Sequence, residues 1–386
     1  MKTVRASWAV AAAVVLLAAC GKQETPQGAG DPVVVRIGSV APLTGPQASL
    51  GKDNDNGARL AIEEINAQGL TIGGRKVRFE LVSEDDQASG TVATTVAQKL
   101  VDEKVRGVIG HLNSGTTIPA SKIYSDAGIP QISPSATAIA YTAQGFKTAF
   151  RVMTNDGQQG KVLGDYAVQK LGAKTVAIID DRTAYGQGLA DEFEKAAKAN
   201  GAIITSREYT TDRSTDFLAI LTSIKGRKPD LVFFGGMDPQ AAPMVKQMRG
   251  LGIKAKFLGG DGVQNIEFLK LAGADAEGVV ASSPGLPIAK MPEGKAFIGK
   301  FEAKYGKIQL YAPYAYDAVY AMVGAMQQAD STEPAQYLPA LARLSRNGVT
   351  GTIAFDEKGD IKGGAVTLYQ VQNGAWAVLE TMGAAQ

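Results

Sequence analysis

Residues 108–120 (VIGHLNSGTTIPA) and 129–137 (IPQISPSAT) are the two stretches that decide how this chain folds. Each begins with hydrophobic residues typical of a buried strand and ends in small hydroxyl residues, and a helix is predicted after the first. Two adjacent strand ends converge in one crevice, which is where open α/β sheets bind ligands. Backbone N–H groups at a helix start, together with Ser and Thr hydroxyls, suit a carboxylate. The same residues are also typical of helix caps, and both interpretations stay open at this point.

Strands and helices alternate along the rest of the chain with little interruption. Residues 33–40 form a nearly continuous β-branched run, as expected of a strand buried on both faces. Further strands are predicted at 77–82, 105–109, 175–179, 230–234 and 256–258, and helices at 53–68, 91–102, 188–199, 241–249 and 265–271. In the last third, long helices are predicted at 313–328 and 335–344, and short strands at 351–355, 367–372 and 375–379. This order predicts an α/β fold whose parallel sheets are covered by helices on both faces, and the length favours two lobes.

The amino-terminal residues are typical of a bacterial secretory signal. Lys2 and Arg5 precede an apolar run at 8–17, which is too short to cross a hydrocarbon core of ~30 Å as a helix. The sequence LAACG at 17–21 resembles a lipobox, which predicts removal of a signal peptide at 1–19 and acylation of Cys20. The alternative is an ordinary signal peptide with an accidental cysteine, and either one directs the protein out of the cytoplasm. Residues 20–32 are predicted to be the lipidated cysteine and a flexible polar tether.

The charge and the cysteine content exclude several kinds of partner and site. The whole chain has 40 basic and 38 acidic residues, and removal of 1–19 takes away Lys2 and Arg5, which leaves 38 of each. A chain without net positive charge lacks the field that gathers phosphates, so nucleic acids and anionic lipid surfaces are not expected partners. Cys20 is the single cysteine, so no internal disulfide is expected and no thiolate remains for a zinc site.

Two glycine-rich stretches resemble phosphate-binding motifs but depart from them. The stretch 45–52 (GPQASLGK) has one spacer residue too many for a P-loop, and Asp53 replaces the Ser or Thr that would bind magnesium. The stretch 186–188 (GQG) opens a predicted helix, but Asp191 occupies the third glycine position, where a carboxylate would repel a pyrophosphate. A helix start with tight-turn glycines is the favoured interpretation of the second stretch.

Metal binding and catalysis have equally little support. Residues 53–57 (DNDNG) resemble part of a calcium loop, but Gly57 offers no side-chain ligand and Ala58 stands where glycine is needed. We interpret the segment as a solvated first helical turn whose carboxylates compensate the helix dipole. His111 is the sole histidine; it has the chemistry of a general base, but its place at the end of a buried strand favours a structural role. No enzyme activity, cofactor or metal is predicted.

Several segments together resemble one protein family. They are the lipobox, VRIGSVAPLTGP (35–46), VIGHLNSGTTIPAS (108–121), GIPQISPSAT (128–137), DDRTAYGQG (180–188), FFGGMDP (233–239) and FLGGDGV (257–263). They resemble the branched-chain amino acid (Leu/Ile/Val) binding proteins, the extracytoplasmic receptors of ABC importers, and the resemblance extends from residue 33 to the C-terminus. It implies a type I periplasmic-binding-protein fold, in which two Rossmann-like lobes with parallel central sheets are joined by a three-crossover hinge. The implied amino-terminal lobe is 33–155 plus 285–348, and the implied carboxy-terminal lobe is 156–284 plus 349–386.

The resemblance also implies roles for particular residues. Ser114 matches the serine that binds the carboxylate of the amino acid, and Ser135 and Thr137 match a pair that contacts its carboxylate and ammonium groups. Asp261 matches the acidic residue that takes the α-ammonium, where many members have glutamate. A desolvated zwitterion needs donors at one end and a carboxylate at the other, which agrees with these roles. Tyr185 matches the tyrosine of the second lobe that closes over the ligand.

Some positions depart from the family pattern. Leu50 stands where close relatives carry an aromatic residue that packs on the ligand side chain, and Met237 stands where a tyrosine is common. Both are apolar, so the side-chain pocket should still accept an aliphatic group, and the flexible methionine should broaden the range of ligands. Asn113 replaces a cysteine found in some relatives, and it is predicted, with Leu50 and Met237, to be a ligand-binding residue. Tyr311 is predicted to line the mouth of the cleft.

These observations predict a lipid-anchored, extracytoplasmic solute-binding protein that captures a branched-chain or other neutral aliphatic amino acid for an ABC importer. Its expected partners are the amino acid, an ABC permease of the branched-chain type and a membrane reached through the lipid anchor, and the protein is expected to be a monomer in the periplasm. One alternative keeps the fold and changes the ligand to an amide, urea, an aromatic or an acidic amino acid. Another is a sensor domain that signals through a partner.

Overall fold

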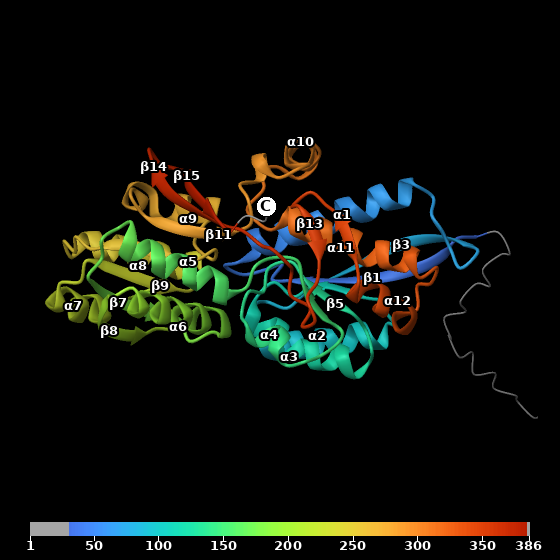
Figure 1. Cartoon of the computed structure of the whole chain (residues 1–386), viewed down its shortest axis with the longest axis horizontal. Helices are drawn as coiled ribbons and strands as arrows, with labels where there is room; N and C mark the ends of the chain where they lie inside the picture. The colour runs from blue at the N-terminus through green and yellow to red at the C-terminus, as the bar shows by residue number, and fades with distance from the viewer. Residues whose placement is uncertain (1–30, 384–386) are drawn as a thin grey trace, which may run out of the picture.

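The structure is a computed structural model that describes residues 31–383, and the predicted signal peptide and Cys20 lie outside the described residues. Figure 1 shows two lobes lying end to end, joined by several chain segments at the centre of the molecule. None of the helices in residues 31–383 combines the length and the apolar character that crossing a membrane requires.

The sheet of the first lobe is built from early strands of the chain. These are β1 (Val33–Ala41), β2 (Thr71–Ile72), β3 (Arg75–Asp85), β4 (Val108–Gly110), β5 (Gln131–Ser133) and β6 (Ala149–Arg151). Their order is β2-β3-β1-β4-β5-β6, and every pair is parallel except β2 with β3. Strands β4 and β5 are neighbours, so the two stretches that decide the fold end side by side at one edge of the sheet, as the sequence predicts.

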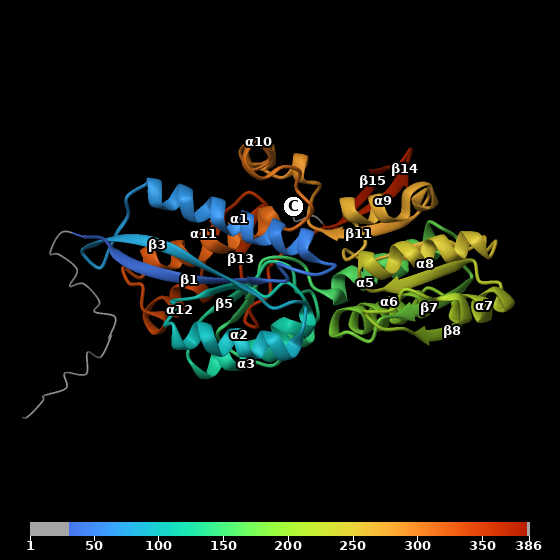
Figure 2. The ribbon, with the colours of Figure 1, turned by 180° about the vertical axis from the view of Figure 1, so that it is seen from behind.

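Helices cover both faces of this sheet, as Figure 2 shows with α1 and α11 on one side and α2 and α3 on the other. The helices of the first lobe are α1 (Ala48–Ala67), α2 (Gly90–Asp102), α3 (Ser114–Asp126), α4 (Ala140–Ala143), α10 (Gly294–Tyr305), α11 (Ala312–Gln328) and α12 (Pro334–Ala342). Val108 packs with α2 and α3, whereas Ile109 packs with α1 and α11. Neighbouring strand residues therefore face opposite apolar layers, which explains the continuous hydrophobic runs in the sequence.

The second lobe repeats the arrangement with a different sheet. Its strands are β7 (Thr175–Asp180), β8 (Ile203–Tyr209), β9 (Leu231–Gly235), β10 (Lys256–Gly259), β11 (Val280–Pro284), β14 (Val366–Gln372) and β15 (Ala375–Met382), in the order β15-β14-β11-β10-β9-β7-β8. Its helices are α5 (Asp156–Gln169), α6 (Ala184–Ala199), α7 (Leu218–Arg227), α8 (Asp238–Gly250), α9 (Ile266–Ala272) and the short 3-10 helix η1 (Gly273–Ala276). Ile178 belongs to the apolar cluster that contains residues of α5 and α6, and Ile179 belongs to the cluster that contains residues of α7, α8 and α9. In this described sheet the pairings of β14 with β11 and with β15 are antiparallel, so β14 runs against the other strands, and every other pairing is parallel.

The chain passes between the lobes at three places. Residues 152–155 lead from β6 to α5, residues 285–293, with the 3-10 helix η2 (Ile288–Lys290), lead from β11 to α10, and residues 355–365 lead to β14. The third crossover follows a small hairpin of β12 (Ser345–Asn347) and β13 (Thr352–Ala354). This topology confirms the predicted fold class. The residue boundaries assigned to each lobe stay a prediction.

The interpretation of residues 53–57 as a solvated first turn is wrong. Helix α1 begins at Ala48, five residues before the predicted start, so Asp53 lies inside the helix and only 4% of its surface is exposed. Its carboxylate accepts hydrogen bonds from the backbone N–H groups of residues 309–312, at 2.8–3.0 Å. The first N–H groups of a helix have no partner within the helix, and Asp53 supplies one for the start of α11. Burial nevertheless raises the pKa of Asp53, against the lowering effect of these hydrogen bonds.

Helices α1 and α11 cross so closely at Gly57 that a side chain does not fit there. A Cβ at Gly57 would lie 2.2 Å from the Ala312 carbonyl oxygen, which is backbone and cannot rotate away. We expect Gly57→Ala to lower the free energy of unfolding by ~1–3 kcal/mol, because overpacking forces the helices apart. Gly299→Ala, in α10 with open space around its Cβ, is the matched control and should leave stability unchanged or slightly higher. Urea denaturation measures both, and equal midpoints for the Gly57 variant and the parent would contradict the close crossing.

Candidate ligand-binding site

The predicted site residues lie at the carboxyl ends of strands in both lobes. In the first lobe, Asn113 and Ser114 follow β4, and Ser135 and Thr137 follow β5. In the second lobe, Tyr185 follows β7 in the first turn of α6, Met237 follows β9 and Asp261 follows β10. The two sets face each other across the junction between the lobes, as expected for ligand sites in open α/β sheets.

A small cavity brings most of these residues together. Its volume is about 20 Å³, and it is lined by Leu112, Asn113, Ser114, Ser135, Tyr185, Met237, Asp261 and Tyr311. Six of them were predicted from the sequence as binding residues, Tyr311 was placed near the cleft, and Leu112 was missed. Leu50 does not line the cavity, because it is packed in the core of the first lobe with 1% of its surface exposed. Thr137 is also absent from the lining and is 1% exposed.

Asp261 is the polar centre of the second-lobe side. It is 1% exposed, and its carboxylate accepts hydrogen bonds from the Tyr185 hydroxyl (2.8 Å), the Tyr311 hydroxyl (2.8 Å) and the Gln159 amide (3.0 Å). Tyr311 belongs to the first lobe, so its bond to Asp261 joins the two lobes. Burial and, after it, the Asp261 carboxylate raise the pKa of both tyrosines well above 10, which keeps their hydroxyls protonated as donors.

The backbone around Asp261 must approach its neighbours closely. A Cβ at Gly260 would lie 2.5 Å from the Tyr185 hydroxyl oxygen and 2.3 Å from a methyl carbon of Leu189. The Tyr185 hydroxyl also accepts a hydrogen bond from the Gly262 N–H at 3.0 Å. The glycines beside Asp261 therefore allow α6 to press against this loop and hold the carboxylate at the cavity.

The first-lobe side offers hydroxyl and amide groups. The Ser114 hydroxyl accepts a hydrogen bond from the Ala138 N–H (3.1 Å), and the Ser135 hydroxyl donates to the Leu112 carbonyl (3.0 Å). The Asn113 side-chain amide donates to the Gln47 side-chain oxygen at 2.7 Å, and the Asn113 side chain accepts no capping hydrogen bond from the N–H groups of α3. The helix-cap interpretation therefore does not account for Asn113. The Thr137 hydroxyl makes no hydrogen bond of ordinary geometry within residues 31–383.

A buried arginine supports the loop that carries Ser135 and Thr137. Arg151, at the end of β6, is 0% exposed and donates to the carbonyl oxygens of Ala136 and Ala138, at 2.9 Å each. Its Nε donates to Asp360 at 2.6 Å, and a second guanidinium nitrogen donates to the Thr142 hydroxyl at 2.7 Å. The two carbonyls flank Thr137, so Arg151 fixes the backbone on both sides of a predicted binding residue.

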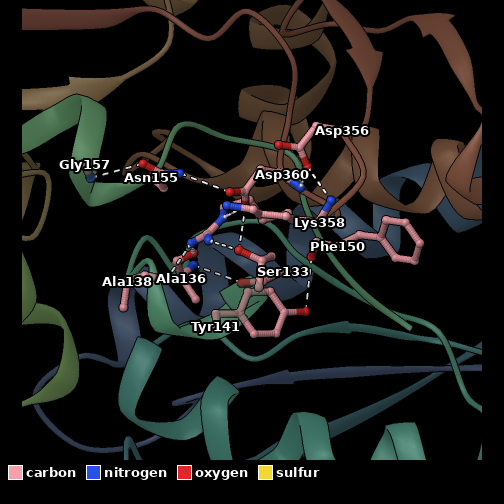
Figure 3. Close-up of polar contacts among 12 residues, drawn as sticks. Ser133, Ala136, Ala138, Tyr141, Phe150, Asn155, Gly157, Asp356, Lys358 and Asp360 are labelled. Carbon is pink, nitrogen blue, oxygen red and sulfur yellow. Dashed lines mark hydrogen bonds and ion pairs between the residues drawn. The ribbon is translucent and has the colours of Figure 1, made fainter. Parts of the chain in front are cut away.

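The same cluster ties two of the crossovers together. Asp360 lies in the third crossover, and its other carboxylate oxygen accepts a hydrogen bond from Asn155 of the first crossover at 3.1 Å. Asn155 in turn caps α5 of the second lobe by accepting from the N–H groups of Gly157 and Gln158. Figure 3 shows Asp360 beside Asn155, with Ser133, Ala136 and Ala138 of the 133–138 loop below them. The binding loop and the hinge thus share one hydrogen-bond network.

His111 has the structural role that the sequence favours. It is 0% exposed, and its two ring nitrogens lie 2.9 Å from an Asp86 carboxylate oxygen and 3.1 Å from the Tyr124 hydroxyl. Both nitrogens are therefore occupied by protein groups beneath the site, and His111 does not line the cavity.

Comparison with known proteins agrees with this architecture. Residues 34–375 match the sequence profile of a family described as periplasmic binding proteins. The chain belongs to the periplasmic binding protein family.

Relatives of this periplasmic binding protein share most of its length. A Leu/Ile/Val-binding protein homolog 1 from Brucella suis is 35% identical over 342 residues, which cover 88% of this chain and 91% of the relative. A leucine-, isoleucine-, valine-, threonine- and alanine-binding protein from Pseudomonas aeruginosa is 34% identical over 337 residues, which cover 87% of this chain and 89% of the relative. The crystal structure of the branched-chain amino acid transporter substrate binding protein LivJ from Streptococcus pneumoniae, in complex with isoleucine, has a TM-score of 0.80 at 31% identity and covers 90% of this chain and 98% of that chain.

Sequence reasoning missed several polar residues of this periplasmic binding protein. Gln159, Asp156 and Arg151 are all buried beside the site, and no local pattern in the sequence marks Arg151. The spacing of Asp156 and Gln159 (i, i+3) in the first turn of α5 was the available signal, because it places both side chains on one face of the helix.

Proposed function

We propose that this periplasmic binding protein captures a neutral aliphatic amino acid, such as leucine, isoleucine or valine, and delivers it to an ABC permease. The observation that carries the proposal is the buried Asp261 carboxylate, which faces Ser114 and Ser135 of the other lobe across the cavity. A desolvated zwitterion needs an acceptor for its ammonium group and donors for its carboxylate, and the two sides of the cavity provide one of each. The relatives named above as binding proteins for small neutral amino acids support the same ligand class.

The side chain of the ligand would contact apolar groups of both lobes. Leu112 belongs to the first lobe and Met237 to the second, and both line the cavity. A cavity of about 20 Å³ holds roughly one water molecule, so leucine requires the lobes to move apart about the three crossovers. Methionine is unbranched and flexible, so Met237 can adjust to aliphatic chains of different shape. Anchoring of the protein to a membrane through acylated Cys20 is part of the same proposal.

Calorimetric titration tests the ligand class. The purified protein is unfolded, freed of carried-over ligand and refolded, and is then titrated with leucine, isoleucine, valine, alanine, phenylalanine, glutamate and a short amide. We expect at least one aliphatic amino acid to bind with Kd on the order of 1 μM or tighter. If no aliphatic amino acid binds but glutamate, phenylalanine or the amide does, the proposed ligand is wrong, although the description of the fold is unaffected.

A further inference from the structure

A second buried carboxylate lies next to Asp261. Asp156 is the first residue of α5 and is 1% exposed, and its backbone N–H donates to the Thr137 carbonyl at 2.8 Å. The Asp156 Oδ2 atom faces the Thr137 hydroxyl. Neither of these two oxygens makes a hydrogen bond of ordinary geometry within residues 31–383. The ligand-binding loop of one lobe and an under-bonded carboxylate of the other therefore meet at this point.

One amide side chain links the two carboxylates. The Gln159 Nε2 lies 3.0 Å from Asp261 Oδ1 and 3.5 Å from Asp156 Oδ1. The orientation of this amide is fixed, because its oxygen accepts from the Asp261 N–H (3.2 Å) and the Ser282 hydroxyl (2.6 Å). Two carboxylates that share one donor in a buried site repel each other strongly when both are ionised, so such a pair retains a proton.

The groups around Asp156 act on its pKa in opposite directions, and the raising effects are the larger. Asp261 approaches from the loop after β10, Tyr185 from α6 and Tyr311 from the start of α11, and the tyrosines stay neutral. The Thr137 hydroxyl, the charge of Arg151 at the end of β6 and the Gln159 amide lower the pKa of Asp156. The Arg151 guanidinium is also hydrogen-bonded to Asp360, Thr142 and two backbone carbonyls. Burial, followed by the charge of Asp261, raises the pKa of Asp156 to about 8.

We propose that Asp156 and Asp261 share a single proton near neutral pH, and that the α-ammonium group of the bound amino acid expels it. The O–H bond of the carboxylic acid breaks, its electron pair stays on the oxygen and the proton passes to the solvent, while the ammonium group keeps its own protons. The cleft then holds two carboxylates against one cation. This inference rests on the proposed function and adds Asp156 to the residues that recognise the ligand.

The sign of the pH dependence follows from the protonation states. Lowering the pH adds the proton that binding must expel, so leucine affinity falls as pH falls. With a free-state pKa of about 8 for Asp156, Kd should decrease by roughly tenfold per pH unit from about pH 6 to about pH 7.5 and level off above the pKa. A site with Asp261 alone ionised throughout would show a flat Kd over this range.

The decisive test uses the wild-type protein and needs no variant. Leucine is titrated at pH 7 in phosphate and in Tris, whose heats of ionisation differ, and the difference in binding enthalpy gives the number of protons released. We expect about one proton per leucine bound. If leucine binds with equal enthalpies in both buffers, no proton is released, and the shared-proton inference is wrong while the proposed function stands. Absence of binding by every amino acid tried would overturn the proposed function, and this inference with it.

Two variants identify the source of the proton. Asp156→Asn should still bind leucine, release no proton, show the same Kd from pH 6 to 8 and bind at least about tenfold more weakly than wild type at pH 7.5. Asp238→Asn is the matched control, because Asp238 is 2% exposed, has a pKa raised to about 7 by burial and adjoins Met237. Proton release should persist in the Asp238 variant. Release of one proton by the Asp156 variant, or its loss in the Asp238 variant, would contradict the assignment.

Discussion

Replacing Asp261 with alanine is expected to abolish leucine binding while the protein stays folded. The substitution removes the buried anion that the proposed function assigns to the α-ammonium, and removing one partner of a buried charge pair costs ~3–5 kcal/mol, which corresponds to a rise in Kd of roughly 100- to 5,000-fold. Calorimetric titration with leucine at pH 7.5 measures the change. The large effect is expected because 99% of the Asp261 surface is shielded from water, so solvent cannot replace the lost interaction.

The Asp261→Asn variant removes the negative charge of the side chain and nearly keeps its shape. An asparagine can accept from the Tyr185 hydroxyl with its oxygen and donate to the Tyr311 hydroxyl oxygen with its amide, in place of the two carboxylate oxygens of Asp261. The fold and the contact between the lobes should therefore survive. We expect it to lose most of the leucine affinity as well. Circular dichroism and thermal unfolding establish that both variants are folded. Wild-type affinity in either variant would remove Asp261 from the ammonium site.

Replacing Arg151 with methionine is expected to give the largest loss of stability. The guanidinium is fully buried, and its removal leaves the Asp360 carboxylate, 14% exposed, without its cationic partner. Stranding one member of a buried ion pair lowers the free energy of unfolding by ~3–5 kcal/mol. The carbonyls of Ala136 and Ala138 lose their donor at the same time, so leucine affinity should also fall. Urea denaturation and leucine titration measure the two effects.

A double-mutant cycle provides the control for this second prediction. Asp360→Asn alone and the Arg151→Met/Asp360→Asn double variant are compared with the single Arg151 variant under the same conditions. If the pair interacts as the structure shows, the two changes are not additive, and the double variant is less unstable than their sum. Additive losses, or a stable Arg151→Met variant that binds leucine normally, would contradict the shared network of loop and hinge.

The sequence predicts the elements of this fold well because its strands are buried on both faces. Residues 176–179 and 231–234 are continuously hydrophobic, and the structure places them in β7 and β9 between helical layers. Ser114, Ser135 and Asp261 also meet as expected, because each follows the carboxyl end of a parallel strand. Short-range pattern and the geometry of open α/β sheets are sufficient for these predictions.

Features that depend on contacts between distant residues could not be predicted in the same way. Asp53 has the sequence context of an exposed helix start, yet its partners are backbone groups more than 250 positions away. Arg151 and Asp360 are 209 positions apart, and Gln159 and Asp261 are 102 apart. Leu50 was assigned to the site by resemblance, but the packing of α1 places it in the core, which no local pattern shows.

The most direct test of the central claim is a crystal structure of the protein grown with leucine. We expect leucine between the lobes, with its ammonium group within hydrogen-bond distance of the Asp261 carboxylate and its carboxylate on Ser114 and the 135–137 loop. We also expect its side chain to contact Leu112 and Met237. Leucine bound elsewhere, or bound between the lobes with its ammonium group away from Asp261, would contradict the account.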